Sequence, residues 1–198
     1  MKIVAYIASL VSLVAVAAVV LTLRSMAADG QSERPLSRGD EAPGAVVDAQ
    51  GNLHVPSNYR AAYEFLGTWA IASNKGGGSS ELHTVYANHG TSAAYRTTGR
   101  FPDGTVLVKE VYETSTASMT TGTVSHARSL KGWFVMVKDA KNSYPGNPRW
   151  GDGWGWSWFD AGNPMTTTST DYKKDCLGCH VPARDTDWVY TSGYPVLH

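Results

Sequence analysis

The chain carries one short motif near its C-terminal end, Cys176-Leu177-Gly178-Cys179-His180. Two cysteines three positions apart, followed at once by histidine, form the attachment pattern of a c-type haem. Each thiol can add across one vinyl group of the porphyrin, and the histidine can then offer an imidazole nitrogen to the iron. The motif therefore predicts one covalently attached haem c, bound by Cys176 and Cys179, with His180 as the metal ligand.

Three other uses of the two thiols stay open from the residues alone. Cys176 and Cys179 are the only cysteines of the chain, so they could form a structural disulfide. A zinc site needs about four ligands, and the chain has no second cysteine pair. A redox dithiol of the thioredoxin kind is expected within a βαβ pattern, which the downstream sequence lacks.

Charge and composition narrow the class of protein. Lys and Arg together number 17, as do Asp and Glu, so the formal net charge is zero. A nucleic-acid-binding protein usually has an excess of basic residues, so we expect no nucleic-acid partner. The chain has 20 glycines and 7 tryptophans, together with many Thr and Val residues, and this favours sheet over helix.

The N-terminal region contains an uncharged run of 21 residues, 3 to 23. Such a run can span a bilayer as a helix, and it is longer than the core of about 7–15 residues of a signal peptide. Ser25-Met26-Ala27 nevertheless resembles a small-x-small cleavage site. Residues 1–28 are thus interpreted as a hydrophobic helix, either a single transmembrane anchor or a signal peptide.

Both interpretations place the rest of the chain outside the cytoplasm. We expect residues 29–45 to be a polar linker and residues 46–198 to be the folded haem domain. The predicted location is the periplasmic side of the bacterial cytoplasmic membrane, either anchored by the N-terminal helix or secreted into the periplasm. Membrane contact is expected only through that helix, if it is uncleaved.

Alternating and turn-forming residues predict a mainly β (α+β) domain, an antiparallel, sandwich-like sheet with a few short helices. Three tryptophans of the last strand, Trp154, Trp156 and Trp158, share one face, as a core stripe or as a haem or dimer contact. Thr170 or Asp171 can cap a short helix that carries the cysteine motif. The expected strands are 81–87, 105–114, 122–128, 132–138 and 153–160, and an early helix is expected over 56–65.

Lys109 stands out in the clearest of these strands. It shares a face with Leu107 and Val111, and both faces of the strand are mostly apolar, so we expect cover on both sides. A buried ammonium is costly and its pKa tends to fall. The side chain could reach solvent, pair with a carboxylate, or be placed for chemistry.

Several blocks of the chain together resemble the cytochrome P-460 family. The resemblance implies a mostly antiparallel β fold, often a homodimer, with one haem. It also implies that His180 is the axial ligand and that the opposite side of the iron is open. The blocks are Val55-Pro56-Ser57-Asn58-Tyr59-Arg60, Phe101-Pro102-Asp103-Gly104-Thr105-Val106-Leu107-Val108-Lys109-Glu110, the cysteine motif, Asp187-Trp188-Val189-Tyr190 and Tyr194-Pro195-Val196-Leu197.

The resemblance also implies an activity. Cytochromes P-460 carry a lysine cross-linked to the porphyrin, and Lys109 stands at its position. They oxidise hydroxylamine and pass the electrons to an external acceptor, such as a soluble cytochrome c. A sister group, the cytochromes c′-beta, has the same fold without the cross-link, and it binds nitric oxide under an apolar cap.

Two positions depart from the family pattern. Phe134 stands where the hydroxylamine oxidisers carry an acidic residue, and it would deprive a substrate of a proton acceptor. His83 stands where an arginine is usual and could partly replace that acceptor. It could equally be an exposed or hydrogen-bonded strand histidine.

The leading hypothesis is an oxidoreductase that acts on hydroxylamine or a related small nitrogen oxide, with Lys109 and His83 as catalytic residues. Cofactor contacts are expected from Cys176, Cys179, His180, Lys109 and Phe134. The alternatives are a gas-binding protein without turnover and a plain electron-transfer cytochrome. The last would need a sixth ligand, for which Met119, His126 and Met136 are candidates.

Overall fold

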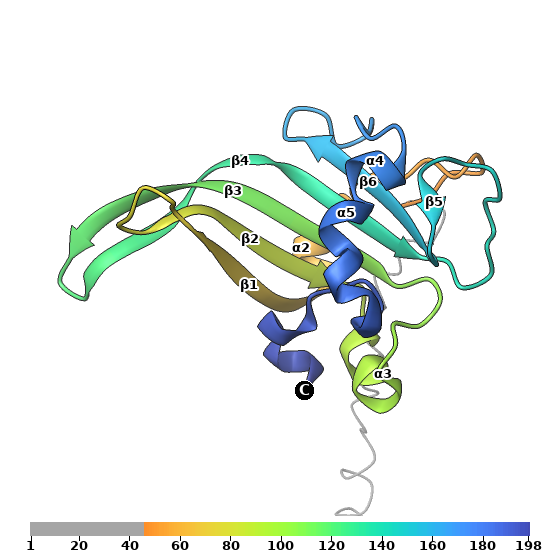
Figure 1. Ribbon diagram of the computed structural model, residues 1–198, viewed down its shortest axis with the longest axis horizontal. Coiled ribbons are helices and arrows are strands. Elements are labelled where there is room, and N and C mark those ends of the chain that lie inside the picture. Colours follow the sequence, from red (N-terminus) through yellow and green to blue (C-terminus); the bar gives the residue numbers. More distant parts are fainter. Residues whose placement is uncertain (1–45) are drawn as a thin grey trace, which may run out of the picture. The chain divides into compact units, whose positions relative to one another are not determined.

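A computed structural model describes residues 46–198, which form one six-stranded antiparallel sheet in the order β1-β2-β3-β4-β6-β5 (Figure 1). The predicted fold class is confirmed, whereas the expected hydrophobic helix and polar linker lie outside the described residues. Within residues 46–198, no helix has the length and apolar character needed to cross a membrane. The strands are β1 (Glu64–Ala72), β2 (Ser79–Ala87), β3 (Val106–Met119), β4 (Gly122–Lys138), β5 (Trp150–Gly151) and β6 (Trp154–Asp160).

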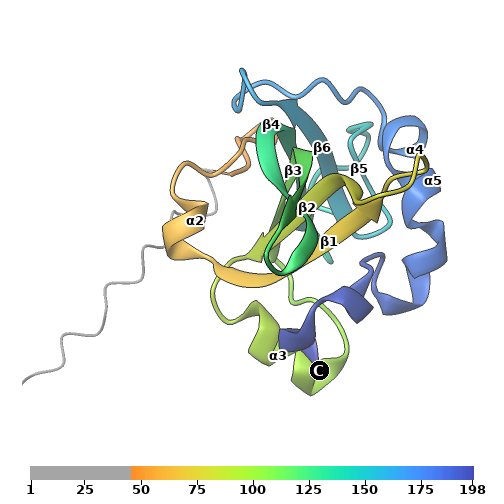
Figure 2. The ribbon, with the colours of Figure 1, turned by 90° about the vertical axis from the view of Figure 1, so that its left-hand side faces the viewer.

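Short helices cover the sheet on both sides. Helix α2 (Tyr59–Ala62) lies on one face, and α4 (Tyr172–Asp175) and α5 (Leu177–His180) lie on the other (Figure 2). Helices and loops, rather than a second sheet, therefore complete the layers. The remaining helices are α3 (Thr91–Thr98) and the 3-10 helices η2 (Val181–Thr186), η3 (Thr191–Gly193) and η4 (Pro195–Leu197).

Strand register assigns each side chain of the sheet to one of two cores. Lys109 on β3 lies opposite Phe134 on β4 and Val85 on β2, and directly paired residues share a face. The same face carries Leu107 and Met136 in one apolar cluster. The opposite face holds a second cluster, so the prediction that this strand is covered on both sides is confirmed.

Two predicted elements differ from the structure. The expected strands 122–128 and 132–138 are one strand, β4, without a turn between them. The β3–β4 register shifts twice between Val111 and Thr114, because β4 carries an extra residue each time. Such bulges accommodate the residues that suggested a turn. The expected helix 56–65 shrinks to α2, since Glu64 already pairs with Ala87 at the start of β1.

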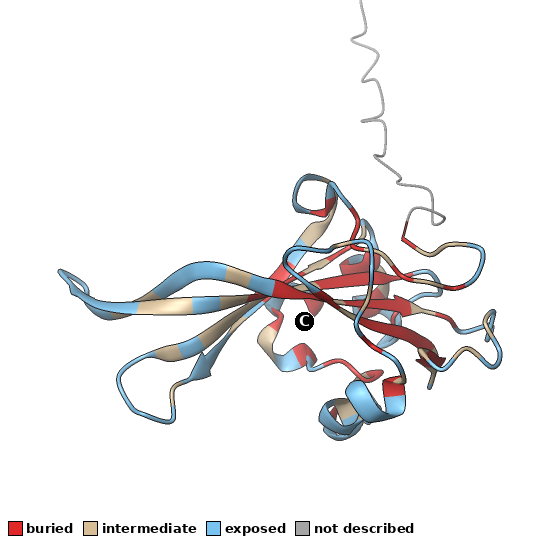
Figure 3. Ribbon diagram, turned by 90° about the horizontal axis from the view of Figure 1, so that it is seen from above, coloured by how far each residue is buried: buried red, intermediate tan, exposed pale blue. Residues whose placement is uncertain are grey.

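Burial is concentrated where the helices cross the sheet. Figure 3 shows buried residues gathered there, while the far end of the sheet is exposed. The far end includes the β3–β4 hairpin, whose tip residue Met119 is 61% exposed. The part of the sheet beneath α4 and α5 is thus the part that can enclose a ligand.

Candidate functional site

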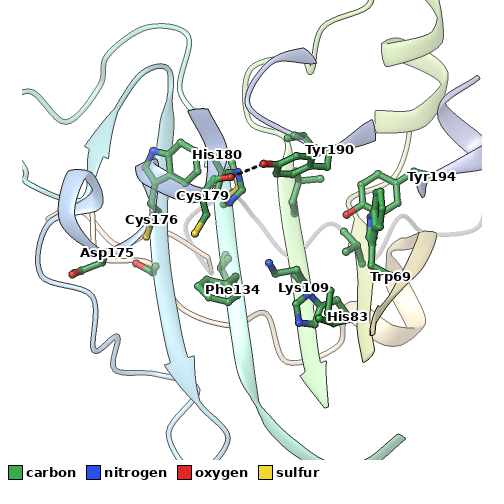
Figure 4. A pocket seen from close by; sticks show the side chains of 18 residues that line it. Trp69, His83, Lys109, Phe134, Asp175, Cys176, Cys179, His180, Tyr190 and Tyr194 are labelled. Carbon is green, nitrogen blue, oxygen red and sulfur yellow. Dashed lines mark hydrogen bonds between the residues drawn. The ribbon is translucent and has the colours of Figure 1, made fainter. Parts of the chain in front are cut away.

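One cavity of about 500 Å³ lies between the sheet and the C-terminal helices (Figure 4). Its walls are mostly apolar, as is usual for a cofactor site. Strands β1, β2, β3, β4 and β6 supply one wall, and α4, α5 and the tail supply the other. All six residues that the sequence singled out line it, namely His83, Lys109, Phe134, Cys176, Cys179 and His180.

The cysteine motif is held by a capped helical turn. The Asp171 carboxylate accepts a hydrogen bond from Lys173 N at 2.9 Å and caps α4, which confirms the expected cap. Asp175 Oδ2 accepts reciprocally from Thr170 N at 2.7 Å. Cys176 separates α4 from α5, so the motif lies in α5 and at its N-cap, directly after the capped helix rather than within it.

Neither thiol is engaged in a disulfide. Cys176 is buried and Cys179 is exposed. Burial raises the pKa of the Cys176 thiol to about 11, which is unsuited to a redox dithiol that works through a thiolate. Among residues 46–198, no three His, Cys, Asp or Glu side chains are grouped as a metal site would need. The pair thus fits thioether attachment better than the zinc or dithiol alternatives.

His180 is oriented by a backbone carbonyl. Its Nδ1 lies 2.7 Å from Trp188 O, and its ring meets Trp156 edge-on, with the ring centroids 4.9 Å apart. Since a carbonyl only accepts, Nδ1 carries the proton and Nε2 keeps a free lone pair. Burial lowers the pKa of His180, which favours the neutral form that binds metals.

Lys109 points into the cavity from the opposite wall (Figure 4). Its Nζ lies 4.3 Å from the centroid of the Phe134 ring. No carboxylate of residues 46–198 forms an ion pair with it, and burial lowers its pKa. Of the three roles open to this lysine, the carboxylate pair is therefore not observed among the described residues.

His83 connects the cavity to the protein surface. Its Nε2 lies 2.9 Å from Glu81 Oε2, and Lys131 Nζ lies 2.5 Å from Glu81 Oε1. Side-chain exposure rises along this series, at 17%, 28% and 44% for His83, Glu81 and Lys131. Burial lowers the pKa of His83, and the Lys131 ammonium lowers that of Glu81, so a neutral imidazole faces an ionised carboxylate.

Sequence reasoning missed several members of the site. Glu81 could have been found, because it lies two residues before His83 on the same strand face. Tyr190 could not, since its contact is with the backbone: its OH donates to Cys179 O at 2.7 Å. Glu81 itself contacts His83 and does not line the cavity, whereas Trp69, Ile71 and Tyr194 are lining residues that sequence reasoning also missed.

The tryptophan stripe divides between core and cavity. Trp154 is fully buried in the core, whereas Trp156 also forms part of the cavity wall, and Trp158 packs against Phe134 at 4.5 Å between ring centroids. Of the candidate sixth ligands, Met136 lines the cavity. Met119 and His126 lie on the exposed β3–β4 hairpin and do not line it.

Comparison with known proteins supports one assignment of this site. The family model described as cytochrome P-460 matches residues 56–191, a stretch that contains all six predicted residues. No curated protein matches the chain. The size of the cavity, its apolar walls, the two unpaired thiols and the free Nε2 of His180 fit the haem that this family binds.

Proposed function

The chain belongs to the cytochrome P-460 family, and from this premise we propose that it is an exported mono-haem cytochrome that oxidises hydroxylamine or a related small nitrogen oxide. The observation that carries the proposal is the Lys109 amine, which points into the cavity opposite the cysteine motif without a carboxylate partner among residues 46–198. An amine in that state is a costly feature for which the fold alone gives no reason.

In the proposed arrangement, Cys176 and Cys179 would hold one haem c, and His180 Nε2 would bind its iron. The haem would supply iron chemistry that can bind a nitrogen compound and accept electrons from it. The walls, mostly apolar, exclude water from the cavity. Phe134 packs beneath Lys109 and keeps the side chain in place.

Lys109 is the proposed cross-linking residue. Burial lowers its pKa, which raises the share of neutral amine at a given pH. The neutral amine has a lone pair that it could present to a bound porphyrin, whereas the ammonium has none. A porphyrin held by Lys109 would be strained, and such strain is one means by which a protein can tune a haem.

His83 is the proposed proton acceptor in place of the missing acidic residue at Phe134. Its lowered pKa keeps it neutral and able to accept a proton near neutral pH. Glu81 and Lys131 continue the series to the surface, so a proton taken at the cavity has a route to solvent.

The proposed electron acceptor is external, such as a soluble cytochrome c. Oxidation of the nitrogen compound reduces the protein, so an acceptor must reoxidise it before the next turnover. We further propose a periplasmic location, by anchor or secretion, and association as a homodimer. These follow from the uncharged N-terminal run and from the family resemblance.

A Lys109→Ala variant tests the function. The wild-type ferrous protein should have a strongly red-shifted spectrum and should oxidise hydroxylamine with a cytochrome c acceptor. The variant should show an ordinary c-type spectrum and lose at least about tenfold in rate, if the amine contributes as catalytic groups commonly do. Lys141→Ala is the control, since that lysine is exposed and pairs with Asp103. Oxidation that survives in Lys109→Ala would remove Lys109 from the mechanism.

A gas-binding protein without turnover is the second candidate, and Phe134 favours it. The phenyl ring lies against Trp158 and leaves the cavity without an acidic group at that position. This candidate predicts an ordinary c-type spectrum, tight nitric oxide binding and no hydroxylamine oxidation. A six-coordinate spectrum with a methionine ligand would instead indicate electron transfer through Met136.

A further inference from the structure

An unusual backbone corner lies beside the proposed axial ligand. Asp187 and Trp188 are consecutive non-glycine residues with φ of 61° and 68°, in the left-handed region. L-residues rarely adopt this conformation, and two in succession persist only where the surroundings enforce them. The corner therefore needs an account of what holds it and of what it achieves.

The Asp187 side chain holds the corner from inside the protein. It is 4% exposed, and its Oδ1 lies 2.6 Å from Lys138 Nζ at the end of β4. Its Oδ2 accepts a hydrogen bond from Phe101 N at 3.1 Å. The Asp187 carbonyl is also fixed, because Trp154 Nε1 donates to it at 3.1 Å. The corner is thus held by contacts with strands β4 and β6.

The corner delivers one atom to the haem site. It turns the chain back over η2, where Trp188 N donates to Ala183 O at 2.8 Å. Trp188 O then meets His180 Nδ1 at 2.7 Å. A carbonyl held in this way fixes the tautomer and orientation of a metal-binding imidazole and raises its basicity.

We propose that Asp187 is a positioning residue for His180, acting through the Trp188 carbonyl, and that it thereby sets the reduction potential of the haem. The inference rests on the proposed function, in which His180 binds the iron. A more basic imidazole stabilises ferric over ferrous iron, so loosening the corner should raise the potential.

The test compares Asp187→Asn with Asp185→Asn in the haem-loaded protein. Asparagine tolerates the left-handed conformation, so the first variant removes the ion pairs with Lys138 and, at 4.0 Å, with Arg100 while sparing the backbone. The second removes the same charge from an exposed position two residues away. The readouts are the midpoint potential and the iron–imidazole stretching band of the ferrous protein.

We expect Asp187→Asn to shift the ferric–ferrous equilibrium about tenfold toward ferrous, about 59 mV for a one-electron couple, and to lower the stretching frequency. Asp185→Asn should match the wild type in both. Lys138→Gln should move both readouts in the same direction, and it decides the matter alone if Asp187→Asn fails to fold. Unchanged potential and band in a folded variant overturn the proposal.

Failure of the proposed function has a different signature. If His180 does not bind the iron, the wild-type ferrous protein itself lacks the iron–imidazole band. If the protein binds haem through His180 but does not oxidise hydroxylamine, the band is present and the Asp187 comparison remains valid. The two ideas are thus tested by separate measurements.

Discussion

At the scale of single residues, the β3 neighbours Lys109 and Glu110 point to opposite faces of the sheet. Lys109 points into the cavity, while Glu110 points into the second core and is 2% exposed. Glu110 Oε1 accepts from Tyr59 OH at 2.5 Å and from Arg60 Nε at 2.6 Å. Trp133 Nε1 in turn donates to Tyr59 OH at 2.8 Å. Glu110 thus has its hydrogen-bond partners on the side of the sheet that faces away from Lys109.

Removal of the Tyr59 hydroxyl should weaken the fold without altering the haem. Tyr59→Phe leaves Glu110 and Trp133 each short of a buried partner, so the free energy of unfolding should fall by about 1–3 kcal/mol. The ferrous spectrum should not change, because the network faces away from the cavity. Urea unfolding of the holoprotein measures the loss.

Tyr112→Phe is the comparison variant, since Tyr112 OH also interacts with Glu110 and Arg60, but its hydrogen bond from Arg60 is exposed. It should stay within about 0.5 kcal/mol of the wild type. Equal losses in the two variants would contradict the interpretation that burial makes the Tyr59 hydroxyl important.

At the scale of elements, the four-residue helix α4 positions the cysteine motif that follows it. So short a helix has little stability of its own, and its end caps and contacts must supply it. The Asp171 cap and the reciprocal bonds of Asp175 close its first turn. Tyr172, stacked on Trp156 with an interplanar angle of 15°, attaches it to β6.

Loss of the α4 cap should lower the free energy of unfolding, and a substitution that keeps the hydrogen-bond acceptor should restore most of it. Asp171→Ala should lower the free energy of unfolding by about 0.5–2 kcal/mol, as for other N-caps. Asp171→Asn should recover most of the loss, because the amide oxygen also accepts from Lys173 N. Thermal unfolding of both variants checks this, and an alanine variant as stable as the asparagine variant would count against the cap.

At the scale of the whole molecule, one sheet separates two cores with different tasks. The face covered by α2 is packed and closed. The face covered by α4, α5 and the tail leaves the cavity, where burial lowers the pKa of both His83 and Lys109. This division lets one domain combine a stabilising core with a site that is costly to maintain.

Stability should depend on pH through His83. Burial lowers the pKa of His83 and the Lys131 charge adds to this effect, while Glu81 opposes it, so the native protein binds fewer protons than the unfolded chain. The stability linked to the neutral imidazole is then present above about pH 6.5 and is lost as pH falls through the lowered pKa.

Urea unfolding between pH 7.5 and pH 5 checks this dependence. The wild type should lose stability on acidification, and His83→Gln should lose less, because glutamine does not titrate. Identical pH slopes in the two proteins would show that His83 is not the group responsible.

The sequence by itself determined the motif that predicts haem attachment and the face on which each strand residue lies. The spacing of Cys176, Cys179 and His180 is a local property, and alternation along a strand is fixed by backbone geometry. Hence Lys109 was correctly predicted to lie on a strand that is covered on both faces. Only tertiary structure decided that Glu81 and Lys131 extend from His83 and that Trp188 O meets His180 Nδ1. These contacts join separate elements through register, bulges and a left-handed corner, and none of these leaves a periodic signal in the chain.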